Sequence, residues 1–216
     1  MAELQDVATP TSSGSSTKPD LTSPELVELD SHGDIILNIK NGADHRSFRI
    51  SSHAMRLASP VWEKMLTGRW MESRKTVISL LDDDPDTLLI VLRAAHLQHH
   101  KLPKKLTFGQ IVKLAVVCDK YDTATVVRPF LNQWITPFQM NYLVPGYEQW
   151  LSIAWTFGYR DQFMNIAHHL TRTLNMDNED RCLNVNGEIL GELLPTDILG
   201  TLAPEAVHSA QNVDEA

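Results

Sequence analysis

The sequence predicts an α+β fold: a short mixed sheet, made of an N-terminal β-hairpin and a third strand, covered by a helical cluster and followed by additional helices. Two observations predict it. Strand-like alternation of apolar residues is confined to residues 33–50 and 76–83. From residue 84 onward, apolar residues recur at the three- and four-residue spacing of helices. The balance of 43% hydrophobic and 21% charged residues suits a chain that buries an ordinary core.

The two ends of the chain differ from this ordered part. Residues 1–30 are rich in Ser, Thr, Pro and acidic side chains and contain few large apolar groups. Such a segment buries too little surface to offset the entropy lost on ordering, so we expect a disordered tail. Residues 204–216 are expected to form a second disordered tail. Between them we expect a main domain over residues 31–136 and a helical C-terminal extension over residues 137–203.

A β-hairpin is expected to open the ordered part. Alternate positions from Ile35 to Ile39 are apolar, which is the pattern of a half-buried strand, and the alternation resumes around Phe48. The intervening NGAD, residues 41–44, supplies turn residues and predicts a hairpin with a slightly long loop. A third strand is expected at residues 76–83, where β-branched and aliphatic residues cluster.

The stretch SSHAMRLASPVWEKML, residues 51–66, has a helical composition but holds a proline near its centre. A helix continued across Pro60 would lose about 3 kcal/mol, because proline has no amide hydrogen and its ring clashes with the preceding turn. We therefore predict two short helices, one over residues 52–58 and a second that Ser59 caps and Pro60 begins. This fold-defining corner and its core are assigned to Phe48, Ser59, Pro60, Trp62, Met65 and Leu66.

Longer helices are expected after the third strand. Asp84 is a suitable N-cap, and Pro85 suits the first position of the helix that follows. Two more helices follow this one, and Pro129 is expected to kink or divide the second of them. A further pair is separated by Gly158, and a final helix is expected near residues 187–199.

Charge, apolar runs and cysteine usage restrict the partners and the compartment. A formal net charge of −8 argues against nucleic acid, whose phosphates require concentrated Lys and Arg. The one basic stretch, residues 99–105, is short and contains a proline, which is typical of a solvated loop. No apolar run approaches the roughly 18 residues of a membrane span, so no membrane partner is expected. The two cysteines form no CxxC pair, which favours a reducing compartment, cytoplasmic and/or nuclear.

The chemistry-bearing residues form no recognisable active site. Nine histidines invite a metal hypothesis, but they lack the ligand spacing of zinc sites. Cys118 lies on the apolar stripe of its helix and is expected in the core, whereas Cys182 is expected to be an exposed thiol. No phosphate-binding, hydrolase or metalloprotease motif occurs. We therefore expect a protein that is not an enzyme, with no catalytic, cofactor-binding or metal-binding residues.

Trp70 is the tryptophan whose neighbours are most polar. It follows Arg69 and precedes Met71, and an exposed Trp beside Arg and Met has the composition of an interaction hot spot. The alternative is a Trp that folds over the edge of the helical cluster.

Several segments together resemble a BTB/POZ domain, in the form common in filamentous fungi: GDIILNI, FRISSHAMRLASPVWEKMLTGRWMES and TVISLLDDDPDTLLIVLRAAH. The similarity continues through IVKLAVVCDKYDTATVVRPFLNQWI, which resembles the closing helix pair of that domain. WLSIAWTFGYRDQF resembles the helical extension that follows it in fungal members. The resemblance covers residues 33–175, and the order and spacing of the segments carry it.

The resemblance implies a module for protein–protein interaction that mediates homo- or hetero-oligomerisation, with a homodimer as one form. The alternative is a substrate adaptor for a cullin-based ubiquitin ligase, with a cullin scaffold as its partner. Adaptors often carry a hydrophobic-x-Glu element in the segment that here reads LQHHKLPKK, which contains no Glu.

A candidate partner interface also follows from the resemblance. In the animal repressor type, an acidic residue on the first strand pairs with a basic residue before the first helix, in a pocket at the dimer interface. Asp34 matches the acidic position, and Ser52 stands at the basic one. The residues assigned to the interface are Asp34, Ser52, Met55, Arg56, Arg69, Trp70 and Met71.

Overall fold

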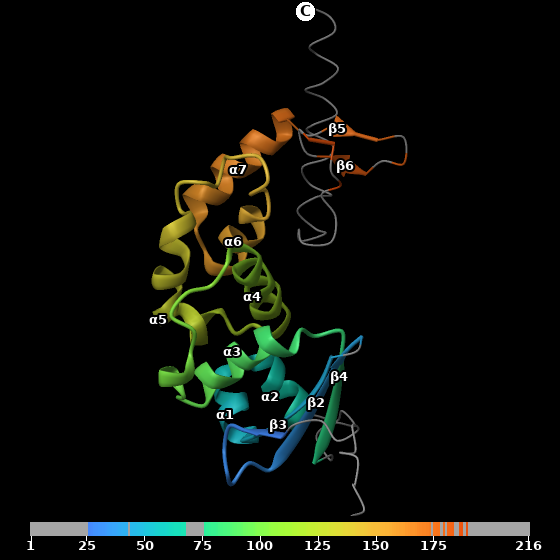
Figure 1. Ribbon diagram of the computed structural model, residues 1–216, viewed down its shortest axis with the longest axis vertical. Coiled ribbons are helices and arrows are strands. Elements are labelled where there is room, and N and C mark those ends of the chain that lie inside the picture. The colour runs from blue at the N-terminus through green and yellow to red at the C-terminus, as the bar shows by residue number, and fades with distance from the viewer. Residues whose placement is uncertain are drawn as a thin grey trace, which may run out of the picture.

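The predicted α+β class is confirmed by a computed structural model, which describes residues 26–42, 44–67 and 76–173, with parts of 175–189. The sheet lies at one end of the molecule, and the helices α1–α3 lie against it (Figure 1). The helices α4 and α5 form the middle, and α6 and α7 lie at the other end.

The main sheet has four strands in the order β1-β3-β2-β4. The central hairpin consists of β2 (Ile35–Asn41) and β3 (Asp44–Ile50), which pair antiparallel. The outer strands β1 (Leu26–Glu28) and β4 (Val77–Leu81) both pair parallel to their neighbours. The strand β1 lies within residues 1–30, so the prediction that this whole segment is disordered is wrong at its C-terminal end.

The hairpin loop is shorter than predicted. Asn41 pairs with Asp44, which leaves a two-residue connection. Gly42 has a φ of +57°, and a positive φ at this position suits the primed turns that match the twist of two paired strands. The side chains that face the helices are fully or almost fully buried: Ile35, Leu37, Ile39, Phe48, Ile50 and Ile78.

The two short helices predicted around Pro60 are present as α1 (Ser52–Ala58) and α2 (Pro60–Thr67). Ser59 fixes the corner between them. Its buried hydroxyl accepts a hydrogen bond from the backbone N–H of Trp62 at 3.0 Å, which caps α2. The same hydroxyl donates to the carbonyl oxygen of Tyr121 at 2.5 Å, so it also attaches the corner to a distant helix.

Aromatic and polar contacts surround this corner. The ring of Trp62 stacks on Tyr121 with 5.1 Å between centroids. The Tyr121 hydroxyl donates to Asp83 at 2.7 Å, and the Lys120 ammonium lies 2.8 Å from the other carboxylate oxygen. Burial, and then the adjacent carboxylate, raises the pKa of Tyr121 far above its ordinary value, so the phenol stays protonated.

The six residues assigned to the corner and its core divide into three groups. Phe48, Ser59, Trp62 and Leu66 are buried, as the prediction requires. Met65 is half-buried and packs against the core, and Pro60 is exposed at the start of α2.

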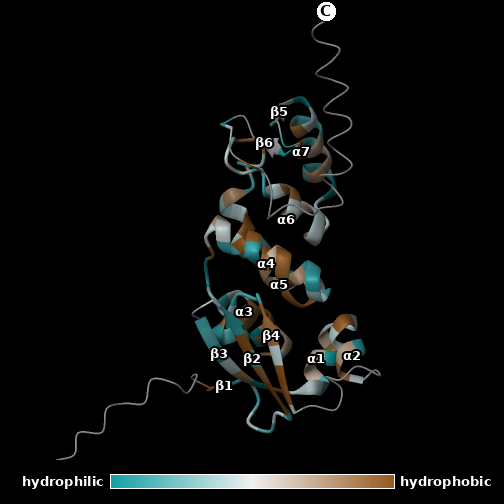
Figure 2. Ribbon diagram, turned by 90° about the vertical axis from the view of Figure 1, so that its right-hand side faces the viewer, coloured by the Kyte–Doolittle hydropathy of each residue, from teal (hydrophilic) through white to brown (hydrophobic). Residues whose placement is uncertain are grey.

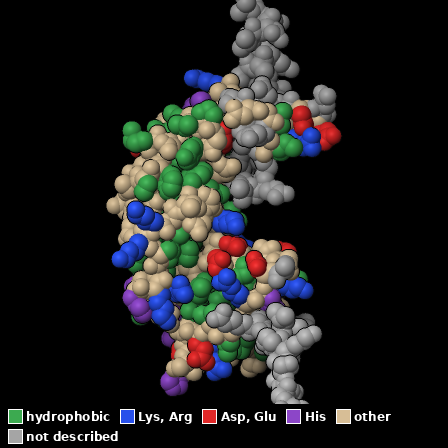
Figure 3. Space-filling view, viewed as in Figure 1, with side chains coloured by type: hydrophobic (Ala, Val, Ile, Leu, Met, Phe, Trp, Pro, Cys, Tyr) green, Lys and Arg blue, Asp and Glu red, His purple; other side chains and the backbone are tan. Residues whose placement is uncertain are grey.

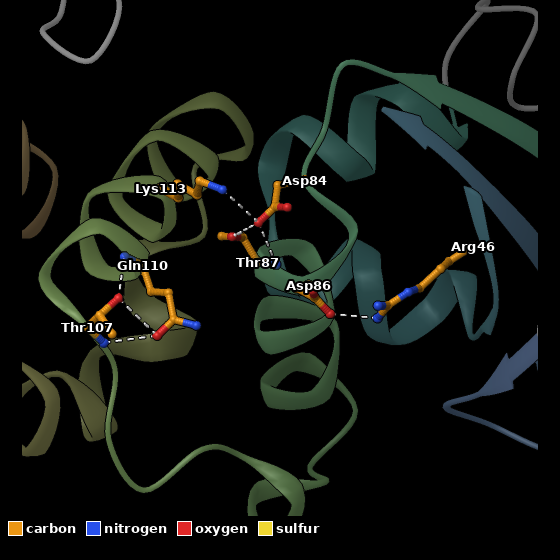
Figure 4. Close-up of polar contacts among 7 residues, drawn as sticks. All are labelled: Arg46, Asp84, Asp86, Thr87, Thr107, Gln110 and Lys113. Carbon is orange, nitrogen blue, oxygen red and sulfur yellow. Dashed lines mark hydrogen bonds and ion pairs between the residues drawn. The ribbon is translucent and has the colours of Figure 1, made fainter. Parts of the chain in front are cut away.

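The helix α3 (Pro85–Ala95) begins as predicted. Asp84 accepts a hydrogen bond from the backbone N–H of Thr87 at 3.2 Å and another from the Thr87 hydroxyl. Arg46 on β3 reaches Asp86 in the first turn at 2.6 Å, so the sheet and the helix start are joined (Figure 4).

The helix α4 (Phe108–Tyr121) runs beside α3. Thr107 and Gln110 form a reciprocal capping box at its start, shown on the left of Figure 4. One turn later, Lys113 lies 3.9 Å from Asp84, a weak ion pair between the two helices. Figure 2 shows that hydrophilic and hydrophobic residues alternate along α4 and α5. This mixture is typical of amphipathic helices that place one face on a core.

The remaining helices pack onward from this pair. The helix α5 (Ala124–Ile135) is continuous across Pro129. Of the two outcomes expected at this proline, a kink or a division of the helix, the division is wrong, and the kink stays a prediction. The helices α6 (Trp150–Phe157) and α7 (Arg160–Thr173) are separated as predicted at Gly158, whose φ of +76° is a conformation that glycine adopts without a steric penalty.

Aromatic side chains join these last helices to α4. Phe108 lies between three other rings, with centroid distances of 4.6 Å to Tyr147, 5.8 Å to Phe138 and 6.5 Å to Trp150. Trp150 is buried and contacts Tyr159 edge-on at 6.4 Å. Aromatic contacts around Trp150 therefore help to hold this end of the molecule, together with the buried aliphatic side chains of α6 and α7.

Short elements complete the described chain. Single 3-10 turns lie at His99–Lys101 and Thr136–Phe138. After α7, β5 (Asn175–Met176) and β6 (Cys182–Leu183) form a small antiparallel pair inside the segment expected to be helical. The predicted final helix near residues 187–199 falls outside the described residues, apart from two that are not helical.

Candidate functional site: an interaction surface

Asp34 and Ser52, the two positions that the resemblance assigns to an acid–base pair, lie together at the start of α1. The Ser52 backbone N–H donates to one Asp34 carboxylate oxygen at 2.7 Å, and the Ser52 hydroxyl donates to the other at 2.6 Å. Burial alone would raise the pKa of Asp34, but these hydrogen bonds outweigh it and hold the pKa below its ordinary value. Hydrogen bonds between Asp34 and Ser52 therefore replace the acid–base pair of the animal repressor type.

His96 holds the same end of α1 from the other side. Its Nε2 accepts a hydrogen bond from the backbone N–H of Ser51 at 3.0 Å, and its Nδ1 lies 2.8 Å from the carbonyl oxygen of Leu92. Because an amide N–H can only donate, Nε2 must carry a lone pair, and Nδ1–H must be the donor to Leu92. Burial lowers the pKa of His96 against the opposing effects of the Leu92 carbonyl and Asp30, which favours this neutral form.

The outward side of α1 differs from the expected interface at one position. Met55 is fully buried, so it belongs to the core and offers no surface to a partner. Arg56 and Leu57 follow it at steps of about 100° around the helix and are both exposed. Leu57 exposes 78% of its surface, and Arg56 makes no ion pair within the described part of the chain.

A shallow groove of about 940 Å³ lies beside α1. Its walls come from the end of β1, from α1, from the C-terminal end of α3 and from α5. Four alanines of α1 and α3 keep it open with their small side chains: Ala54, Ala58, Ala94 and Ala95. Leu57 and Leu97 also line it, and Leu97 exposes 77% of its surface.

The charge of this groove is negative at neutral pH. Its charged lining residues are Glu28 and Asp30, at the end of β1 and just after it. Glu28 makes only a loose ion pair with Arg49, at 3.5 Å between Glu28 Oε1 and Arg49 Nε. The groove also contains His53 and His99, besides His96. An apolar segment that carries a positive charge is the complementary ligand.

The other residues assigned to the interface lie in one segment. Arg69, Trp70 and Met71 fall outside the described residues. The prediction of an exposed hot spot at Trp70, and its alternative of a Trp folded over the helices, both stay predictions.

A second apolar surface lies at the other end of the molecule. Trp155 exposes 53% of its surface, and its ring lies 5.8 Å from that of Phe163. Met164 is exposed on the same helix as Phe163. Figure 3 shows hydrophobic side chains gathered over this upper, helical end of the molecule.

The chemistry of the described residues agrees with the expected place of Cys118. The side chain is fully buried, and burial raises the pKa of its thiol to about 12, so the nucleophilic thiolate is absent at neutral pH. The Cys182 side chain lies outside the described part. Among the described residues, no group of three or more His, Cys, Asp and Glu could hold a metal ion. No described helix has both the length and the apolar character to cross a membrane.

Sequence reasoning missed Leu57 and Leu97 as surface residues. Leu57 was missed because Met55 was assigned to the interface, whereas the buried Met55 turns the residue two positions later to the opposite side of the helix. Leu97 could not have been found, because its exposure depends on the left-handed turn that ends α3.

Comparisons with known proteins leave the family unassigned: no protein-family model matches this chain, and no curated protein matches it. The BTB/POZ resemblance stays a prediction that rests on the residues quoted above.

Proposed function

We propose that this chain is a non-enzymatic protein–protein interaction module, which forms homo- or hetero-oligomers through its BTB/POZ-like part. The observation that carries the proposal is the outward side of α1, where the exposed Leu57 lines an open groove and the exposed Arg56 precedes it on the helix. Arginine is enriched among the residues that contribute most to protein–protein binding, and an exposed leucine in a groove offers apolar area that a partner can bury.

The attachment of α1 supports this role. Its first turn is held by the Asp34 carboxylate and by the His96 imidazole, which contact neighbouring backbone amides. A helix anchored at this end presents its outward side in one orientation. A partner therefore loses less conformational entropy on binding than it would against a mobile segment.

The chemistry of the described part gives an enzyme hypothesis no support. The Cys118 thiol is buried with a pKa of about 12, and the buried Asp83 carboxylate is engaged by Lys120 and Tyr121. Both groups stabilise the core, and an interaction module requires nothing more of them.

Charge reversal at Arg56 tests the proposal. We expect the wild-type chain to self-associate in sedimentation velocity and light scattering, and Arg56→Glu to shift it toward the monomer by at least about tenfold in the dissociation constant. Arg160→Glu, on the exposed start of α7, is the matched control and should leave association unchanged. Circular dichroism should be the same for all three proteins.

Two results would contradict the proposal in its homo-oligomeric form. One is a wild-type chain that stays monomeric up to about 100 μM, since specific self-association is normally tighter than this. The other is an Arg56→Glu variant that associates as well as the wild type, which would place the interface away from α1.

A further inference from the structure

The C-terminal end of α3 has an unusual residue at its turn. The Gln98 N–H donates to the Arg93 carbonyl oxygen at 2.9 Å, and the Leu97 N–H donates to Ala94 at 3.2 Å. These two bonds are the Schellman motif, in which the residue at the position of Leu97 adopts a left-handed conformation. Leu97 has a φ of +58°. Glycine is the usual residue there, because a Cβ is sterically unfavourable in this region.

Besides its left-handed backbone, Leu97 also places a large apolar side chain in solvent. Its side chain is 77% exposed, so it contributes little to the core that would offset the conformational penalty. Strain of this kind persists most often at sites where function requires the side chain. Leu97 lines the same groove as Leu57 of α1, and the two leucines place exposed apolar surface on two of its walls.

We infer that Leu97 is a contact residue of self-association, and that the groove beside it receives Leu57 and Arg56 from a second copy of this chain. The inference rests on the proposed function and assigns both sides of the contact: the groove on one copy, and Arg56 and Leu57 on the other. Leu57 would fill the alanine-lined space beside Leu97. Arg56, which has no ion pair among the described residues, would approach Glu28 and Asp30 at the end of β1.

A second copy suits this groove because the ligand and the receptor lie on one surface. The groove calls for an apolar group with a positive charge beside it, and α1 presents an exposed leucine directly after an exposed arginine. In a two-fold dimer, the same patch serves both subunits, so each copy would give one leucine and receive another.

Replacement of Leu97 by glycine separates a binding role from a folding role. We expect Leu97→Gly to raise the urea midpoint of unfolding, because the strain is relieved, and to weaken self-association at least about tenfold. Leu97→Asn, which also tolerates the left-handed conformation, should weaken association in the same way. Unfolding is measured below the dissociation constant, so that association does not add to stability.

Two controls accompany these variants. Leu57→Ala should weaken association without raising the unfolding midpoint. Met140→Ala removes another exposed apolar side chain, 88% exposed and not among the groove residues, and should leave association unchanged.

A charge-exchange experiment tests the pairing of Arg56 with the acidic wall. Glu28→Lys and Arg56→Glu should each be monomeric alone, and an equimolar mixture should form a heterodimer. In that mixture both contacts are complementary. The glutamate introduced in one variant would meet the lysine introduced in the other, and the unchanged Arg56 and Glu28 would meet in the second groove. Each variant must first show the wild-type circular dichroism spectrum.

The outcomes distinguish this inference from the proposed function. A wild-type chain that never self-associates refutes the inference and the homo-oligomeric form of the proposed function. Association that Arg56→Glu weakens, but that Leu97→Gly and Leu57→Ala leave intact and the mixture does not restore, keeps the proposed function and overturns the inference. A lowered unfolding midpoint in both Leu97 variants would also overturn it, because the side chain would then support the fold.

Discussion

The two ends of the molecule are held together in different ways. Around the sheet and α1–α3, polar side chains join residues that are far apart in sequence. The Ser59 hydroxyl bonds to Tyr121, 62 residues away, and the Gln98 amide bonds to the Leu29 carbonyl oxygen, 69 residues away. At the other end, α6 and α7 pack around the buried Trp150 and its ring contacts.

The two kinds of contact contribute differently to the free energy of unfolding and to the relative placement of the helices. Buried aromatic area contributes much free energy, but it tolerates small shifts between helices. A hydrogen bond between a buried hydroxyl and one particular carbonyl contributes less, but it defines a single arrangement. The surface proposed for interaction on α1 lies in the part of the molecule where such hydrogen bonds define the geometry.

The largest effect is expected where aromatic area is removed. Trp150→Ala should lower the free energy of unfolding by about 3–5 kcal/mol, because it leaves a cavity among the rings that join α4 to α6. Trp155→Ala, which removes an exposed ring, should cost less than about 1 kcal/mol. Urea unfolding followed by circular dichroism measures both. Similar losses would mean that α6 and α7 do not depend on the Trp150 cluster.

A smaller but more specific effect is expected at the corner. Ser59→Ala should cost about 2–3 kcal/mol, because it removes the cap of α2 and leaves the buried Tyr121 carbonyl without its donor. Ser51→Ala is the matched control, since Ser51 caps α1 through a long 3.4 Å bond to Ala54. Its loss should stay near 1 kcal/mol. Equal losses in the two variants would show that the bond to Tyr121 contributes nothing.

The smallest effect is expected from the titration of His96. Its pKa in the folded state is below the unfolded value of 6.5, so the folded chain binds this proton less readily. The stability that the neutral imidazole contributes is present above pH 6.5 and is lost as the pH falls through the folded-state pKa. The protonated ring would have no lone pair for the Ser51 amide, and the nearby carboxylate of Asp30 only partly opposes this effect.

His96→Gln provides the comparison for this titration. We expect the free energy of unfolding of the wild type to fall as the pH drops below 6.5, the unfolded-state value, and that of the variant to fall less. The other histidines, including His53 and His99 in the groove, are present in both proteins. The carboxylate of Asp34 titrates below this range, since its pKa is lowered from 3.8. Parallel pH profiles would mean that His96 does not hold α1.

The elements that the sequence predicted well are those whose signal is local. Burial repeats every second residue on β2 and every third or fourth on α4, so apolar spacing located both. Asp84 and Ser59 cap helices that begin at the next residue, and Pro60 could be placed because a proline is tolerated at a helix start.

The features that could not be predicted from the sequence depend on contacts between residues far apart in the chain. The strand β1 has only three residues, and nothing in LVE identifies a strand until it pairs with β3, about twenty residues later. The role of His96 depends on Ser51, 45 residues earlier. The hydrogen bonds between Asp34 and Ser52 were not predicted, because the resemblance gave only an acid–base pair whose basic position is a serine here. Met55 was misplaced, because the seven residues of α1 do not show by their spacing which side faces the core.

The bond between Ser59 and Tyr121 also sets an order of events during synthesis. At about 5–20 residues per second, a ribosome adds the 62 residues between them in roughly 3–12 seconds. Throughout that interval Trp62 has no Tyr121 ring to stack on, and the α1–α2 corner has no carbonyl to hold it. The α1–α2 corner therefore cannot reach its final arrangement until α4 has been synthesised.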